Sequence, residues 1–189
     1  MQLLIGTSNK NKINEISEII KDYYDIITLN DLNITIEPPN ENGDSYLQNS
    51  YIKAKFYSQL TGLPTLADDS GLEIKLLNNR PGIYSSRWAG STATLQEKRQ
   101  YLEDEMHKIN IDSSPARYIC AVTYIHNDVT NMAQEICYGI IKSKPSNVNG
   151  LLYDPYFYVF DKALSEYSLT DKNLISHRGL AIRKLFDLY

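Results

Sequence analysis

Residues 2–29, QLLIGTSNKNKINEISEIIKDYYDIITL, decide the fold class of this chain. A short apolar run at 3–6 predicts a strand that ends in a Gly-Thr-Ser turn. The isoleucines that follow recur at helical spacing and predict a helix over 10–23, and another apolar run predicts a strand over 25–29. Strand, loop, helix and strand in this order form a βαβ pattern, which favours an α/β fold with helices flanking a sheet.

The rest of the chain continues this alternation, with no internal repeat and no linker rich in glycine, serine and proline. Two alternating runs, 116–126 and 132–141, lie on either side of the turn Asn127-Asp128 and predict an antiparallel hairpin, so a mixed sheet is expected. Other expected elements are a helix from Asp44 or Ser45 to Gly62, a strand over 64–67, a hairpin arm over 73–77, a helix over 95–108 and a last helix from about Thr170. The sequence therefore predicts a single domain over residues 1–189.

The composition excludes several classes of protein. Of the 189 residues, 42% are hydrophobic and 22% are charged, which is typical of a globular chain and excludes disordered, collagen-like and coiled-coil proteins. The net charge of −4 argues against a protein that holds nucleic acid through phosphate contacts, so an anionic ligand needs a local basic site. There is no apolar run long enough for a membrane span and no signal peptide pattern, so a cytoplasmic protein without a membrane partner is expected. Cys120 and Cys137 are too few for a metal cage and are expected to be buried thiols.

The loop between the first strand and the first helix is the first candidate site. Its residues are Gly6, Thr7, Ser8, Asn9, Lys10, Asn11 and Lys12. Amides at a helix N-terminus attract anions, small polar side chains add donors, and the two lysines add charge, so the loop suits a triphosphate. The spacing is not that of a Walker loop, and an ordinary N-cap flanked by two solvated lysines is the alternative.

Two adjacent aspartates, Asp68 and Asp69, follow the strand expected over 64–67. Neighbouring residues of a strand point to opposite faces, so we expect that the two are not both buried. One of them would serve as metal ligand or general base while the other caps backbone amides. Glu41, in a loop rich in proline and asparagine, could share a hard cation, because Mg²⁺ needs only one or two carboxylates beside phosphate oxygens and water. A plain Asx turn is the alternative.

The segment 176–179, Ser-His-Arg-Gly, lies within the last expected helix, one turn after Lys172. Arg178 offers a planar fork for a phosphate or for a base carbonyl, and His177 can donate or accept a hydrogen bond. A surface position is the alternative for the histidine.

In this order, these segments resemble the inosine triphosphate pyrophosphatase family, which acts on non-standard purine nucleoside triphosphates. The matching segments span nearly the whole chain and are Thr7-Ser8-Asn9 with Lys12, Tyr51-Ile52-Lys53-Ala54, Ala67 to Leu72, Pro81 to Arg87, Tyr153-Asp154-Pro155 and Ser176-His177-Arg178-Gly179. No single segment is decisive, but the ordered set is specific. The resemblance implies an elongated mixed β-sheet flanked by helices, two lobes around a central substrate cleft, and a homodimer.

The resemblance also implies an activity and a set of site residues. The family hydrolyses ITP, dITP and XTP to the monophosphate and pyrophosphate with Mg²⁺, which implies a house-cleaning hydrolase. Asp69 would be the proton acceptor for the attacking water, Lys12 would lie nearest the developing charge, and Glu41 and Asp69 would be the metal carboxylates. The implied substrate-binding residues are Thr7, Ser8, Asn9, Lys10, Asn11, Lys12, Ser70, Leu151, Leu152, Tyr153, Asp154, Lys172, His177 and Arg178. The last three would face the base, where a 6-oxo group accepts hydrogen bonds and an adenine amino group would leave buried donors unpaired.

The segment that would stack on the base departs from the family pattern. Where the family has a stretch ending in Gly-Phe-Gly before its Tyr-Asp-Pro, residues 145–152 read PSNVNGLL, and the segment is about four residues shorter. Leu151 stands at the stacking position and Leu152 replaces a glycine. Loss of an aromatic stack costs ~1–3 kcal/mol per base in nucleic-acid cases. Tyr153 is one candidate to compensate, and Trp88, in a segment expected as a loop or an aromatic packing cluster, is the other.

The sequence leaves three functions open. The first is Mg²⁺-dependent hydrolysis of deaminated purine nucleotides, and the second is the same hydrolysis with altered or broad base selectivity. The third is a catalytically silent nucleotide-binding homodimer, against which the presence of Lys12, Glu41, Asp69 and Arg178 counts. Gln48, where the family commonly has glutamate, removes a charge near the expected metal and could weaken its binding.

Overall fold

The computed structural model describes residues 1–147 and 150–188. Val148 and Asn149, which belong to the altered stretch 145–152, and Tyr189 lie outside the described residues. The chain falls into two compact units, which are described separately here. Unit 1 comprises Met1–Ser70, Ile119–Ile136 and Asn173–Tyr189, and unit 2 comprises Gly71–Tyr118 and Cys137–Lys172. The single domain expected over 1–189 stays a prediction.

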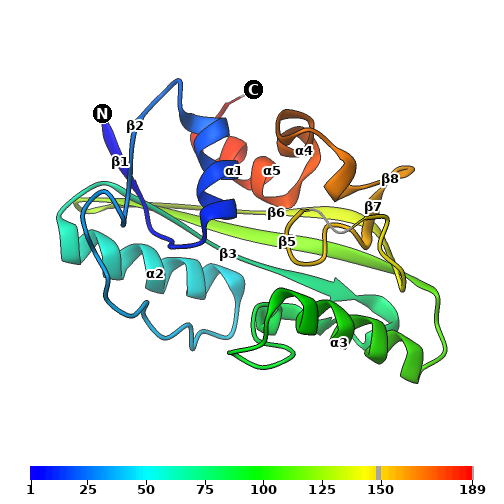
Figure 1. Ribbon diagram of the computed structural model, residues 1–189. Coiled ribbons are helices and arrows are strands. Elements are labelled where there is room, and N and C mark those ends of the chain that lie inside the picture. The colour runs from blue at the N-terminus through cyan, green and yellow to red at the C-terminus, as the bar shows by residue number, and fades with distance from the viewer. Residues whose placement is uncertain (148–149, 189) are drawn as a thin grey trace. The chain divides into compact units, whose positions relative to one another are not determined.

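Helices and strands alternate up to α3, after which β5 to β8 follow one another and the described chain ends with α4 and α5 (Figure 1). The helices are α1 (Lys10–Ile20), α2 (Tyr46–Thr61), α3 (Leu95–Lys108), α4 (Leu169–Ile175) and α5 (His177–Phe186), with short 3-10 helices at Lys75–Leu77, Gly82–Tyr84 and Leu164–Glu166. The strands are β1 (Gln2–Ile5), β2 (Asp25–Thr28), β3 (Thr65–Ile74), β4 (Arg80–Pro81), β5 (Ser113–His126), β6 (Val129–Lys142), β7 (Phe157–Val159) and β8 (Lys162–Ala163). The α/β class read from the sequence is confirmed. None of the helices in the described chain is both long and apolar enough to cross a membrane.

Within the described residues, the strands pair into one sheet in the order β2-β1-β3-β5-β6-β7-β8, with β4 paired to β3. β1 is parallel to β2 and to β3, so that Leu4 lies opposite Ile27 and Thr65. β4, β7 and β8 pair antiparallel to their neighbours. The mixed sheet is therefore confirmed, and the expected hairpin is present as the neighbours β5 and β6, joined at Asn127-Asp128.

In unit 1, β1 is buried on both faces. Leu3 and Ile5 pack in a cluster with Ile16 of α1 and Ile182 of α5, whereas Leu4 packs in a different cluster with Tyr57 of α2. Successive side chains of a strand point to opposite faces, so α1 and α5 cover one face of this strand and α2 covers the other (Figure 1). This double cover is what a parallel βαβ unit requires, because each of its faces must be shielded from water.

Local capping signals set the helix ends in unit 1. Ser45 begins α2 by accepting a hydrogen bond from the Gln48 amide, and Gly62 ends it with a left-handed φ of 69°. The single last helix expected from Thr170 is wrong, because Ser176 is extended (φ −75°, ψ 152°) and its side chain accepts from the Gly179 amide as the N-cap of α5. A serine that bonds nearby backbone amides starts a helix in preference to continuing one.

Unit 2 contains α3, whose bounds match the expected 95–108 and whose start is fixed by a capping box between Thr94 and Glu97. Trp88 packs edge-on against Tyr101 with ring centroids 5.1 Å apart, so the aromatic packing cluster is confirmed. Cys137 in this unit and Cys120 in unit 1 are both buried and form no disulfide, as expected.

Candidate active site

The site is built where β3 extends past the end of β1. β1 pairs with β3 only at Leu4 and Ile5, so the later residues of β3 lie beyond the point where β1 turns into the loop 6–9. Asp68 and Asp69 are therefore strand residues, and neither the strand end expected at residue 67 nor the Asx turn is present. The expectation that only one of them would be buried is wrong, since their exposed fractions are 0% and 5%.

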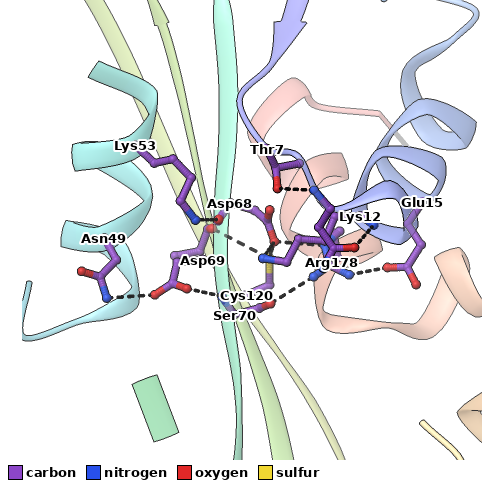
Figure 2. Close-up of polar contacts among 12 residues, drawn as sticks. Thr7, Lys12, Glu15, Asn49, Lys53, Asp68, Asp69, Ser70, Cys120 and Arg178 are labelled. Carbon is purple, nitrogen blue, oxygen red and sulfur yellow. Dashed lines mark hydrogen bonds and ion pairs between the residues drawn. The ribbon is translucent and has the colours of Figure 1, made fainter. Parts of the chain in front are cut away.

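Asp68 is buried because two cations neutralise it. Its Oδ2 lies 3.0 Å from Nζ of Lys12 and 3.1 Å from Nε of Arg178. Figure 2 shows this carboxylate on β3 facing the lysine of α1 and the arginine of α5. Burial alone would raise the pKa of Asp68, but the two cations outweigh it and hold the pKa well below its usual value. Asp68 is therefore ionised, and it ties the first turn of α1 to the start of α5.

Arg178 is fixed in place by three groups. Its guanidinium donates to Asp68, to the carboxylate of Glu15 and, over 3.0 Å, to Oγ of Ser70. Burial opposes the charge, but Asp68 and Glu15 more than offset that effect and raise the pKa of Arg178. These contacts use three of its five N–H donors, and among the described residues no partner is shown for the other two.

Asp69 has surroundings of the opposite kind. Its Oδ2 accepts a hydrogen bond of 3.0 Å from Nδ2 of Asn49, and its Oδ1 accepts one of 2.9 Å from the Ser70 amide. Burial raises the pKa of Asp69, Lys53 and Lys12 lower it, Glu41 raises it further, and the net shift is upward. A carboxylate with an elevated pKa and no direct ion pair to a cation is suited to accept a proton.

Lys53 connects Asp68 to Glu41. Its Nζ lies 2.6 Å from Oε1 of Glu41 and donates to the Asp68 carbonyl over 3.0 Å. Burial would lower the pKa of this lysine, but Glu41, Asp68 and Asp69 raise it above the usual value, so the side chain is charged.

The loop before α1 combines features of both interpretations made from the sequence. Asn9 is the N-cap, accepting from the amides of Asn11 and Lys12, and its own amide donates to Oγ1 of Thr7. Lys10 is exposed, as the ordinary N-cap alternative holds, but Lys12 is not, since its side chain is 17% exposed and paired with Asp68. The exposed residues Ser8, Asn9, Lys10 and Asn11 thus surround a helix N-terminus beside a fixed cation.

The remaining substrate residues expected from the sequence divide between the units. His177 is buried at the first position of α5 in unit 1, next to Arg178. In unit 2, Nζ of Lys172 lies 2.5 Å from Oδ2 of Asp154, and that oxygen also accepts from the Leu151 amide. Leu152, the residue after Leu151, is half-buried.

Comparison with known proteins adds an independent observation. A family model described as the Ham1 family matches residues 3–188. The chain belongs to the Ham1 family. The resemblance found in the sequence is thereby confirmed.

Several relatives of this Ham1 chain are similar over nearly their whole length. A dITP/XTP pyrophosphatase from Dictyoglomus thermophilum is 39% identical over 97% of the chain and 91% of its own length. A dITP/XTP pyrophosphatase from Escherichia coli K12 is 33% identical over 98% of the chain and 96% of its own length. The structure of a HAM1 protein from Coxiella burnetii has a TM-score of 0.84 at 32% identity and covers 100% of this chain and 98% of its own.

The donors of this Ham1 chain suit one hard cation that also contacts a ligand. Glu41 and Asp69 offer carboxylate oxygens, and the upward pull of Glu41 on the Asp69 pKa reflects two like charges near each other. The described residues contain no group of three or more His, Cys, Asp or Glu side chains that could hold a metal by themselves. A cation here would need oxygens from substrate and water to complete its shell, which is how Mg²⁺ is usually held.

Three residues of the cluster were not assigned a role from the sequence. Lys53 belongs to a matching segment but was given none, and Glu15 and Asn49 lie on helix faces that give no local signal. Glu15 is 3% exposed and Asn49 is fully buried. The regular spacing of isoleucines in α1 could have shown that Glu15 lies beside the buried face, but its partner Arg178 is 163 residues away.

Proposed function

We propose that this chain is a nucleoside triphosphate pyrophosphatase that converts ITP, dITP and XTP to the monophosphate and pyrophosphate with Mg²⁺. The observation that carries this proposal is the buried cluster in which Lys12, Arg178 and Lys53 all contact Asp68, with Asp69 as the next residue of the strand. Names of the relatives, dITP/XTP pyrophosphatase, support the same substrates.

The proposed reaction is attack of water on the α-phosphorus. A bond forms between the water oxygen and phosphorus, the bond to the bridging oxygen of the β-phosphate breaks, and pyrophosphate leaves with the electron pair. Asp69, oriented by Asn49 and the Ser70 amide, takes the proton of the water. Lys12 adds positive charge beside the loop 6–9, which we expect to hold the triphosphate. The transition state gains negative charge on those phosphates. Mg²⁺, held by Glu41 and Asp69, would add charge on the phosphate oxygens and make the attacking water easier to deprotonate.

Base selectivity is assigned to Arg178, His177 and Lys172. The two N–H donors that Arg178 has left suit an oxygen acceptor such as the 6-oxo group of inosine or xanthine. An adenine amino group in that position would leave a buried donor unpaired. Removal of these bases from the nucleotide pool is the corresponding cellular role, and we include a homodimer in the proposal on the family resemblance alone.

A second candidate is the same hydrolysis with relaxed base selectivity, and Leu151 at the stacking position favours it. Of the two aromatic residues that could compensate, Tyr153 is 1% exposed with its hydroxyl 3.4 Å from the Ser85 carbonyl, and Trp88 packs on Tyr101. Both are engaged in packing within unit 2.

Release of pyrophosphate from ITP, dITP, XTP, ATP, GTP and UTP with Mg²⁺ tests the proposal. A preference of about a hundredfold for the first three, roughly 2.7 kcal/mol in the transition state, is expected. Similar rates for all six would favour relaxed selectivity, and no release from any would favour the silent binding protein. Asp69→Asn is expected to abolish release while nucleotide binding persists, and Asp22→Asn, an exposed aspartate of unit 1, is the matched control.

A further inference from the structure

The backbone around Leu151 is held by an arginine from α3. Nε of Arg99 donates to the Leu152 carbonyl over 2.9 Å, and its Nη2 donates to the Gly150 carbonyl over 3.1 Å. The two acceptors flank Leu151, and all four residues belong to unit 2. One guanidinium therefore holds the carbonyl groups of the two residues that flank the stacking position.

The same residue is held from within its own turn. The Leu151 amide donates to Oδ2 of Asp154 over 3.1 Å, and the Asp154 amide donates back to the Leu151 carbonyl over 2.8 Å. Lys172 fixes the Asp154 carboxylate at 2.5 Å. Both backbone polar groups of Leu151 are thus satisfied by a residue that is itself ion-paired.

We propose that Arg99 is a positioning residue for recognition of the nucleobase, acting through the backbone of Leu151. This inference rests on the proposed function, which gives Leu151 its place against the base. A leucine offers the base less contact area than an aromatic ring does. Its contribution to binding therefore depends on a backbone that is already in position when the base binds. A loop that is already ordered loses less conformational entropy on binding, and the planar fork of arginine suits two carbonyl oxygens better than a lysine does.

The proposal separates base recognition from the chemistry of the triphosphate. Loss of the Arg99 fork weakens binding of ligands that carry a base and leaves binding of pyrophosphate as it is. A purely structural role would instead lower the thermal stability and weaken both kinds of ligand together.

The test compares the full-length chain with Arg99→Met, Arg99→Lys and the control Lys98→Met. Lys98 is the preceding residue of α3, and its side chain makes no polar contact in the described part of the chain. Calorimetric binding of IMP and of inorganic pyrophosphate is measured with Mg²⁺, together with kcat and KM for ITP and the melting temperature. For Arg99→Met we expect the Kd of IMP and the KM of ITP to rise about tenfold, the effect of one lost charge-assisted hydrogen bond. The Kd of pyrophosphate and kcat stay within about twofold, and Arg99→Lys recovers part of the loss.

Two results would overturn the role of Arg99. One is an unchanged affinity of Arg99→Met for IMP, and the other is an equal loss of affinity for IMP and pyrophosphate. Failure of the proposed function looks different, because the wild-type chain would then release pyrophosphate from no triphosphate. In that case the Kd of IMP for Arg99→Met and wild type still tests the role of Arg99. A wild-type chain that binds no IMP overturns both proposals.

Discussion

Asp68→Asn is expected to destabilise unit 1 strongly, because it removes one charge and leaves two cations. The side chains of Asp68 and Arg178 are 0% and 3% exposed, and that of Lys12 is 17% exposed. The new amide would also place N–H donors at the Oδ1 position, which has no hydrogen-bond partner among the described residues. Both changes act at a carboxylate that is itself fully buried, so solvent compensates for them only through the partly exposed Lys12.

The size of the loss follows from what each cation retains. Breaking a buried ion pair from one side costs ~3–5 kcal/mol. Arg178 keeps Glu15 as a partner, and Lys12 has some access to solvent, so we place the loss at about 3 kcal/mol, the lower end of that range. With a urea m-value of ~2–3 kcal/mol/M for a chain of this size, the unfolding midpoint would fall by about 1–1.5 M.

Urea unfolding followed by circular dichroism measures this change in the metal-free protein. Asp22→Asn is the control, since an exposed aspartate changes stability by no more than ~0.5 kcal/mol. If Asp68→Asn lost less than about 1 kcal/mol, the two cations would not depend on this carboxylate and the reasoning from burial would fail.

Three further predictions concern the same unit. The folded-state pKa of Asp68 lies below its unfolded value of about 3.9. The contribution of Asp68 to stability is therefore present above that pH and is lost on acidification. The unfolding free energy of the wild type should fall more steeply below about pH 5 than that of Asp68→Asn, as unfolding at a series of pH values would measure. Glu41→Gln should raise the Mg²⁺ concentration for half-maximal pyrophosphate release by at least about tenfold, and chelation should stop release altogether; an unchanged titration would remove Glu41 from the metal site. Gly179→Ala should cost ~1–3 kcal/mol, because a Cβ there would lie 1.8 Å from the Asn173 carbonyl oxygen and α5 would have to shift; equal melting temperatures would contradict this.

The elements predicted correctly were those with local signals. The βαβ unit, the start of α2, which was expected at Asp44 or Ser45, and the bounds of α3 each follow from residues a few positions apart. The end expected for β3 was wrong because two aspartates in a strand are acceptable only when distant cations reach them, and Arg178 lies 110 residues from Asp68. No local pattern carries that information.

The candidate site shows the same division. The sequence motifs indicated Lys12, Glu41, Asp69 and Arg178. In unit 1, Lys12 and Arg178 both contact Asp68. Glu41 pairs with Lys53 and raises the pKa of Asp69. Glu15 escaped notice because a glutamate on an amphipathic helix usually lies in solvent, and only tertiary packing shows it against Arg178. The roles of metal ligand and base contact came from the family resemblance, because the contacts in the structure do not by themselves assign them.

Asp68 and Asp69 are adjacent yet have opposite pKa shifts, and this difference assigns their roles. Asp68 faces two cations and is stabilised as an anion, whereas burial raises the pKa of Asp69 and the charge of Glu41 raises it further. A carboxyl whose pKa is raised on folding opposes folding at neutral pH, since the unfolded chain ionises it more readily.

Asp69→Asn should therefore be at least as stable as the wild type in the metal-free protein, while it loses pyrophosphate release. The carbonyl oxygen of the new amide can accept from Nδ2 of Asn49, whose own Oδ1 stays bonded to the Gly43 amide, so the hydrogen bond of 3.0 Å between these two side chains need not be lost. Urea midpoints of Asp69→Asn, Asp68→Asn and wild type, measured with chelator at pH 7, compare the two positions directly. A large loss of stability in Asp69→Asn would show that its charge supports the fold as that of Asp68 does. The inference from the raised pKa of Asp69 would then fail. A carboxyl that opposes folding when it is ionised should stabilise the protein when a neutral amide replaces it.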